Sequence, residues 1–341
     1  MTTGCVRCLA VFFAFTAPLS AASLPGADPA TKIWWLRLHS STVAQTLTDA
    51  AQEPRSLVTT YYQAEWGWQP STWFGFQSEL EGGQVVGERK AEHLGVNLGS
   101  QWRLNEMQED PDLFMPVFFF TGSTPERELN WRLGKISPET SFDDNRVARS
   151  KRTKFIALPF YRNPAVAAAS KGLGGYLHWI VSSQAELALC ASDANARSTL
   201  SGFTTWHGEW FRSAELTLHP LADPARASVR LLTWATERGG VHDGGWALNT
   251  DWEIAPQWVT FARAGDGSEQ FARSREFLSG GFGWEAPFGR PRDFLGLGLA
   301  RAKAVSGGLH LETLGEVVYR WQINRLVALS PDVQYIRHPA R

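Results

Sequence analysis

A cluster of charged and amide side chains between residues 132 and 146 could recognise a solute. Its members are Arg132, Lys135, Asp143, Asp144, Asn145 and Arg146. Guanidinium groups donate paired hydrogen bonds and carboxylates accept them, so such groups at close quarters offer several partners to a hydroxyl-rich molecule. This chemistry suits the binding of an uncharged sugar and needs no covalent step. The cations from Arg149 to Lys154 fit a solvated loop equally well.

Polar side chains also recur at every second position in three other stretches. The polar members are Gln101, Arg103, Asn249, Asp251, Glu253, Glu316, Arg320 and Gln322. Successive side chains of a β-strand point to opposite faces, so each stretch predicts a strand with one polar and one apolar face. In the last stretch the apolar face consists of Val317, Tyr319, Trp321 and Ile323. The polar residues either line a watery interior or are simple wall residues of a sheet.

No motif in the sequence predicts catalysis or metal binding. The eight His residues are scattered and form no His-x-x-x-His pair. His178, Ser182 and Ser183 could supply part of a hydrolase triad, but nothing in their spacing marks them as one. The pairs Gly239-Gly240 and Gly280-Gly281 predict turns or bulges, not a phosphate-binding loop. We therefore expect no enzyme activity, no cofactor and no metal site.

Residues 1–22 resemble a secretory signal sequence. Arg7 is their only charged residue, the stretch from Leu9 to Ala17 is apolar, and Ser20-Ala21-Ala22 offers a small-residue cleavage site. Residues 23–341 are then expected to form a single domain, whose one thiol, Cys190, cannot form an internal disulfide. The formal net charge of −1 argues against nucleic acid as a partner. No apolar run after residue 22 is long enough for a membrane-spanning helix.

Alternating strands recur along the chain, most clearly at 58–66, 93–104, 129–134, 246–254 and 315–336. Weaker patterns, including one at 153–160, bring the predicted total to about fifteen. The 16 Trp residues are many for a soluble domain, whereas outer-membrane barrels place aromatic girdles at both membrane interfaces. Tight turns alternate with long connections such as 105–128 and 137–152, which is typical of such barrels. The alternative is a secreted or periplasmic soluble β-protein that binds glycans through Trp-rich surfaces.

Four stretches, in a fixed order, resemble the carbohydrate-selective porin (OprB-like) family of bacterial outer membranes. They are Trp131–Ile136 with Ser141–Asn145 and Asn163–Ala165, then Ala214–Pro220, Gly245–Gly265 and Glu312–Ile336. The resemblance implies an antiparallel transmembrane β-barrel of about 16 strands that passes small sugars by passive diffusion. It also implies a homotrimer, in contact with outer-membrane lipid, whose loops fold inward to narrow the pore.

The resemblance gives the polar residues a location. We expect the cluster at 132–146 to form the pore constriction and the alternating polar residues to line the lumen. The chain departs from the family in two ways: residues 31–128 match only in pattern, and the usual last strand is missing after Arg341. The alternative count is therefore 14 or 15 strands. In that case either an amino-terminal strand, such as Ile33 to Leu38, pairs with 326–336 and closes the barrel, or the chain is truncated and does not assemble.

A barrel and a soluble glycan-binding protein differ in fractionation and electrophoresis. We expect the protein to remain with the outer-membrane fraction and to migrate faster on a gel when it is not boiled. The physical reason is that a closed barrel has no free strand edge at which unfolding begins. A protein that appears in the soluble fraction, with the same mobility before and after boiling, would be the soluble alternative.

Overall fold

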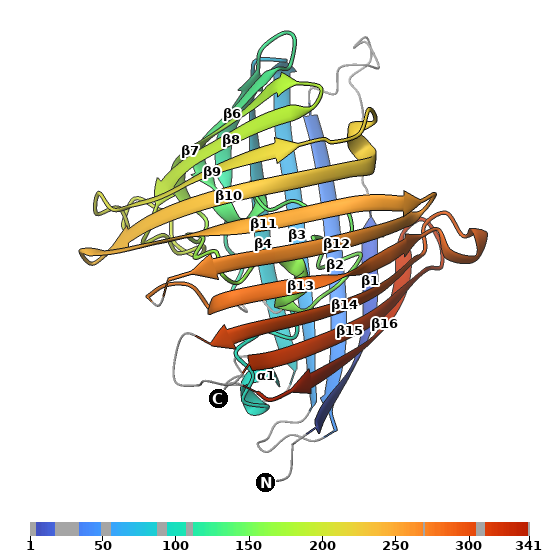
Figure 1. Cartoon of the computed structure of the whole chain (residues 1–341). Coiled ribbons are helices and arrows are strands. Elements are labelled where there is room, and N and C mark those ends of the chain that lie inside the picture. The colour runs from blue at the N-terminus through green and yellow to red at the C-terminus, as the bar shows by residue number, and fades with distance from the viewer. Residues whose placement is uncertain are drawn as a thin grey trace.

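The computed structural model describes residues 5–17, 34–48, 56–86, 94–106, 112–268, 270–304 and 311–339. Sixteen antiparallel strands follow one another around a closed barrel (Figure 1). Each strand is hydrogen-bonded to a neighbour on both sides. This confirms the predicted all-β antiparallel barrel of about 16 strands.

The strands, in chain order, are β1 (Cys5–Ala17), β2 (Trp34–Leu47), β3 (Ser56–Ser71), β4 (Phe74–Val86), β5 (Phe118–Ser123), β6 (Leu129–Ile136), β7 (Gly172–Ser182), β8 (Ala185–Asp193), β9 (Trp210–Leu218), β10 (Ala227–Arg238), β11 (Val241–Ala255), β12 (Trp258–Gly267), β13 (Ser274–Glu285), β14 (Phe294–Ala304), β15 (Leu311–Gln322) and β16 (Val327–Arg337). The connections contain the short helices α1 (Leu94–Asn97), η1 (Pro138–Thr140), α2 (Leu158–Tyr161), η2 (Pro224–Arg226) and η3 (Pro287–Gly289). Within the described residues, no helix has the length and apolar character that a membrane span requires.

Strand β1 closes the barrel between β16 and β2. Its register places Cys5 opposite Arg337 of β16 and Cys8 opposite Leu47 of β2. The expected pairing of residues 33–38 with 326–336 is wrong, because β2 pairs with β1 and β3 instead. Strand β1 belongs to the predicted signal sequence, whose expected cleavage site at residues 20–22 lies outside the described residues. Loss of β1 would leave β2 and β16 as neighbouring edges that run in the same direction, since both are antiparallel to β1.

The barrel wall has the two faces that the alternation predicts. On β15, Val317 and Trp321 are 44% and 42% exposed on the outer surface, whereas Glu316 is buried on the inner side. Outward aromatic rings pair near the short turns, where Trp258 and Trp284 stack with their centroids 4.7 Å apart. Amphipathic rings in this position anchor a barrel at the membrane interface. The apolar face of the last hairpin therefore lies on the outer surface of the barrel.

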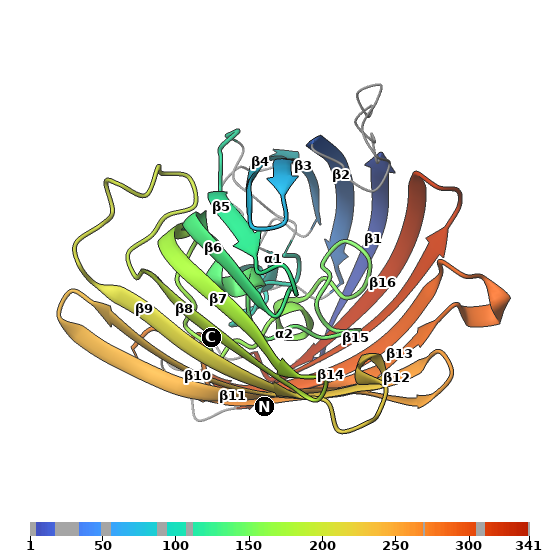
Figure 2. The same ribbon diagram turned by 90° about the horizontal axis from the view of Figure 1, so that it is seen from above.

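Two long connections fold into the barrel, as the view along it shows (Figure 2). One joins β4 to β5 and carries α1, and the other joins β6 to β7 and carries η1 and α2. The strands predicted at 93–104 and 153–160 are therefore wrong. Trp102 and Phe155, from these two connections, are buried in one core with Phe261 and Phe294 of the wall. The alternation near Trp102 arises because this segment lies between the wall and the open lumen, not because it is a strand.

Glycines on the inner face of the wall make room for these connections. A Cβ atom on Gly296 would lie 2.7 Å from the Phe155 ring, and one on Gly298 would lie 2.6 Å from the Phe160 ring. Any larger side chain would therefore push the connection away from β14. Gly280-Gly281, predicted to be a turn or bulge, instead lies within β13 between β12 and β14. The absence of side chains at these positions allows close packing and does not mark a break in the strand.

Candidate functional site

The connection between β6 and β7 is fixed to the wall through Asp143. This residue adopts a positive φ of 56° and is almost fully buried. Its carboxylate accepts hydrogen bonds from the Asn163 backbone N–H at 3.0 Å and from Asn249 Nδ2 at 2.7 Å. The Nε of Arg263, a fully buried residue on β12, lies 3.4 Å from the same carboxylate. Loss of Asp143 would leave a buried guanidinium without its counter-charge, which is strongly destabilising.

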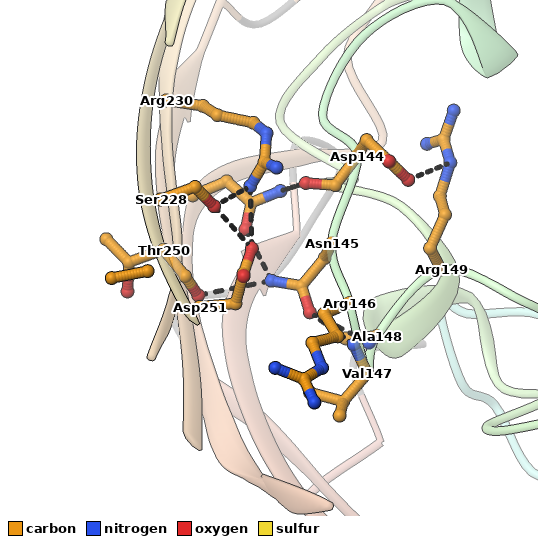
Figure 3. Close-up of polar contacts among 12 residues, drawn as sticks. Asp144, Asn145, Arg146, Val147, Ala148, Arg149, Ser228, Arg230, Thr250 and Asp251 are labelled. Carbon is orange, nitrogen blue, oxygen red and sulfur yellow. Dashed lines mark hydrogen bonds and ion pairs between the residues drawn. The ribbon is translucent and has the colours of Figure 1, made fainter. Parts of the chain in front are cut away.

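Asn145 shapes a tight turn in the same connection and joins it to β11 (Figure 3). Its Oδ1 accepts hydrogen bonds from the backbone N–H groups of Val147 and Ala148 at 3.0 and 2.9 Å. Its Nδ2 donates to Asn249 Oδ1 at 2.7 Å and to the Thr250 carbonyl oxygen at 3.1 Å. An amide can accept and donate at once, and this position uses both capacities.

Buried carboxylates of the wall accept hydrogen bonds from the backbone of the inward connection. Glu215 on β9 accepts from the Asp143 N–H at 2.7 Å. Glu316 on β15 accepts from the N–H groups of Ile156 and Ala157 at 2.7 and 3.2 Å. A segment without regular structure has no strand partner for these N–H groups, so side chains of the wall must supply the acceptors.

Ion pairs attach the connection further. Arg146 lies 2.6 Å from Glu253 and 2.6 Å from Glu285. Burial lowers the pKa of Arg146, but hydrogen bonds to Glu285 and Glu253 outweigh burial and raise the pKa above its usual value. On the neighbouring wall, Arg230 and Asp251 form a pair at 2.7 Å (Figure 3). These charges are thus paired within the protein.

Four of the six predicted constriction residues hold connections in place. Asp143, Asn145 and Arg146 do so through the contacts above. Lys135 is 6% exposed, and its Nζ donates to the carbonyl oxygen of Ser198 at 2.7 Å. Lys135 thereby ties the connection between β8 and β9 to the wall.

Arg132 and Asp144 are the two members of the predicted cluster that face open lumen. The guanidinium carbon of Arg132 lies 5.1 Å from the Tyr176 ring centroid and 5.6 Å from that of Phe119. The side chain of Asp144 is 74% exposed and lies 3.9 Å from the Nε of Arg149 (Figure 3). A solute in the lumen can therefore reach both groups.

The predicted lumen-lining residues divide in the same way. Those that bond to other protein groups are Gln101, Asn249, Asp251, Glu253, Glu316, Arg320 and Gln322. Arg103 lies in a connection, not in the predicted strand, and faces a cavity. The polar inner face along much of β11 and β15 therefore binds the inward connections, because these connections occupy the lumen beside it.

A cavity of about 680 Å³ lies among the long connections and is called the loop-side cavity. Tyr61 and Glu81 line it from β3 and β4, and the Tyr61 hydroxyl donates to Glu81 at 2.7 Å. Arg162 and Arg273 line it from connections. The sequence analysis missed these two arginines because no periodic pattern places side chains in irregular segments. Gln63, another lining residue, belongs to the strand predicted at 58–66.

A second cavity, of about 390 Å³, lies near the short turns and is called the turn-side cavity. Arg132 and Asp144 line it together with a cluster on β7 to β9 that the sequence analysis did not identify. In this cluster, His178 Nε2 lies 2.8 Å and His219 Nε2 lies 2.9 Å from the carboxylate of Glu186. His178 on β7 is therefore paired with the Glu186 carboxylate on β8, the other strand of the same hairpin. The signal that could have found the cluster is inward alternation on neighbouring strands.

The two cavities adjoin at Thr140 of η1, which lines both of them. Its side chain is exposed to the lumen, whereas the preceding Pro138 is buried. The one-turn helix η1 thus forms a step between the loop-side cavity and the turn-side cavity.

Comparison with known proteins connects this geometry to a family. Residues 242–341 match the family model of the carbohydrate-selective porin, OprB family. The high-pH structure of Pseudomonas putida OprB shares the fold, with a TM-score of 0.68 at 9% identity, over 98% of this chain and 93% of that one. The carboxyl-terminal part of the chain thus matches the OprB family model, and the chain as a whole has the fold of a porin. No curated protein sequence matches it.

More distant porins share the same architecture. Two mutants of the Rh. blastica porin align over 98% of this chain and 100% of theirs, with TM-scores of 0.51 and 0.50 at 6% and 7% identity. The fold of the chain is therefore that of a porin barrel.

Replacement of Glu316 should loosen the inward connection between β6 and β7. In Glu316→Ala two buried backbone N–H groups lose their acceptor, at a cost of about 1–3 kcal/mol each. We expect a lower unfolding temperature and a larger, noisier single-channel conductance in planar bilayers. Glu276→Gln, at a side chain that is 60% exposed, is the matched control and should change neither quantity. Wild-type conductance in Glu316→Ala would show that this carboxylate does not hold the connection.

Proposed function

We propose that sugars cross the porin through the loop-side cavity, pass Thr140 and enter the turn-side cavity. The observation that carries this route is that Thr140 lines both cavities. Long connections of outer-membrane barrels face the cell exterior, so a sugar enters at the loop-side cavity and leaves near the short turns. The family description of residues 242–341 supports carbohydrates as the solutes.

The groups along this route suit a hydroxyl-rich, uncharged solute. In the loop-side cavity the Tyr161 ring can cover the apolar face of a sugar. In the turn-side cavity Arg132 donates, while Asp144 and Glu186 accept. Diffusion down a concentration gradient needs neither a cofactor nor an energy source.

Within the predicted constriction, the residues have two roles in this proposal. Arg132 and Asp144 contact the passing sugar directly. Asp143 and Asn145 set the width of the route indirectly, because they fix the connection that carries η1 to β11 and β12. Lys135 and Arg146 act in the same indirect way.

Two further features belong to the same proposal. Residues 1–22 direct export of the chain, as their composition predicts. Three copies associate in the membrane, an arrangement supported by an outward aromatic cluster on β2 to β4. In this cluster the Trp34 ring centroid lies 5.8 Å from that of Trp68 and 6.0 Å from that of Phe76. Chemical cross-linking in detergent counts the copies, and intact-mass analysis of the membrane form locates its first residue.

A bulky side chain at the step between the cavities should obstruct the route. Because Thr140 is exposed to the lumen, Thr140→Trp can fold normally, and its ring then occupies space where the two cavities meet. We expect glucose-driven swelling of liposomes to slow several-fold. Thr233→Trp, at an exposed residue on the outer face of β10, is the matched control and should swell at the wild-type rate.

The same assay tests the direct contact proposed for Arg132. Arg132→Ala should weaken the block of ion current by glucose in planar bilayers, because one bidentate donor is lost. Normal swelling in Thr140→Trp, together with normal block in Arg132→Ala, would place the sugar route elsewhere in the barrel.

A further inference from the structure

The loop-side cavity carries more positive than negative charge. Its lining contains eight Lys and Arg residues but five Glu residues, an excess of three positive charges. The whole chain, by contrast, has a formal charge of −1. The excess is therefore a local property of the cavity and not a consequence of a basic protein.

Most of the carboxylates in this lining are already paired with cations. Glu81 lies 2.5 Å from Lys171, and Glu106 lies 3.2 Å from Nη2 of Arg162. Glu139 forms an ion pair with Nη1, the other terminal nitrogen of Arg162. These carboxylates have little negative charge left to attract further cations.

Among the residues that the structure describes, the side chains of three lining arginines have no hydrogen-bond or ion-pair partner. They are Arg103, Arg197 and Arg273. Burial and the neighbouring guanidinium groups of Arg162 and Arg103 lower the pKa of Arg273 to about 10. The lowered pKa of Arg273 shows that several positive charges lie close together here. Glu106 and Glu139 raise this pKa, but their effect is smaller.

We propose that Arg103 and Arg273 make the loop-side cavity a binding site for monosaccharides that carry a carboxylate or phosphate group. A planar guanidinium binds either anion through two parallel hydrogen bonds, and two unpaired guanidiniums in one cavity supply up to four. A watery cavity with low-dielectric walls and charge of one sign also raises the local concentration of the oppositely charged solute. The hydroxyls of the acidic sugar use the same polar groups as a neutral sugar.

This inference rests on the proposed sugar route and adds a preference for the charge of the solute. The loop-side cavity is the entrance of that route, so an anionic sugar is concentrated where it enters. The turn-side cavity, with Asp144, Glu186 and Glu215 in its lining, offers no comparable excess of cations. The acidic sugar is therefore released toward the short turns.

Three sugars of similar size that differ in charge test the proposal. Glucosamine, glucose and glucuronate are added separately to the full-length porin in planar bilayers, and the concentration that half-blocks the ion current is measured. We expect glucuronate to block at about one tenth of the glucose concentration, because two cations attract it into the cavity, and glucosamine to block least. A salt gradient should give a reversal potential of anion-selective sign, and glucose 6-phosphate should block at least as well as glucuronate.

Substitution of Arg103 and Arg273 tests whether these two residues cause the preference for glucuronate. In the double variant Arg103→Gln/Arg273→Gln we expect the preference for glucuronate over glucose to fall at least fivefold, whereas Arg103→Lys/Arg273→Lys keeps more than half of it. Arg325→Gln, at an exposed arginine in the β15–β16 turn, is the matched control and retains the full preference. The mobility of the unboiled protein on a gel verifies that each variant is folded.

The outcomes for this inference and for the sugar route are distinct. Glucose-driven swelling of liposomes without any preference for glucuronate would overturn the inference and leave the route intact. A preference for glucuronate that survives in the double Gln variant would also overturn it, because other cations would then be responsible. Failure of glucose to swell the liposomes or to block the current would instead contradict the proposed sugar route itself.

Discussion

Every backbone N–H and C=O group inside a bilayer needs a partner within the protein, and the rest of this structure depends on that requirement. On the outside it is met by sixteen strands that pair around a closed circle. On the inside it is met in a different way, because the connections that fill the lumen have no strand partners. There the carboxylates of Glu215 and Glu316 accept hydrogen bonds from the connection that carries η1 and α2. Polar side chains of the inner wall are therefore needed first to satisfy the backbone of the connections. Only those that no connection covers can bind a solute.

This use of the wall decides where the lumen stays open. Phe261 and Phe294 on the inner face pack against Trp102 and Phe155 of the connections, and the glycines of β14 allow the close approach. That side of the barrel is filled. The loop-side and turn-side cavities are lined instead by β3 and β4 and by β6 to β10, together with the connections themselves. One half of the barrel is therefore filled and the other half is open, and the connection with η1 forms the boundary.

Electrostatics follows the same division. Charges buried between wall and connection are paired, as Arg146 is with Glu253 and Glu285, since an unpaired charge there is costly. Charges that face water in the cavities do not carry that cost, so they can remain unpaired and act on a solute. Arg103 and Arg273 belong to this second group. The function of a charged residue in this barrel thus depends less on its chemical type than on whether a connection covers it.

The sequence alone determined the wall, because side-chain alternation with a period of two is a local property of each strand. It correctly separated Val317 and Trp321, which lie on the outer surface, from Glu316, which faces inward. Its family resemblance indicated a porin. It could not determine which inward residues remain open to the lumen, because this depends on contacts between segments more than a hundred residues apart, such as Asn145 with Asn249. For the same reason the alternation at 93–104 predicted a strand where a buried connection lies. Only the tertiary structure brought Arg103, Arg162 and Arg273 into one cavity, since irregular segments carry no periodic signal of where their side chains point.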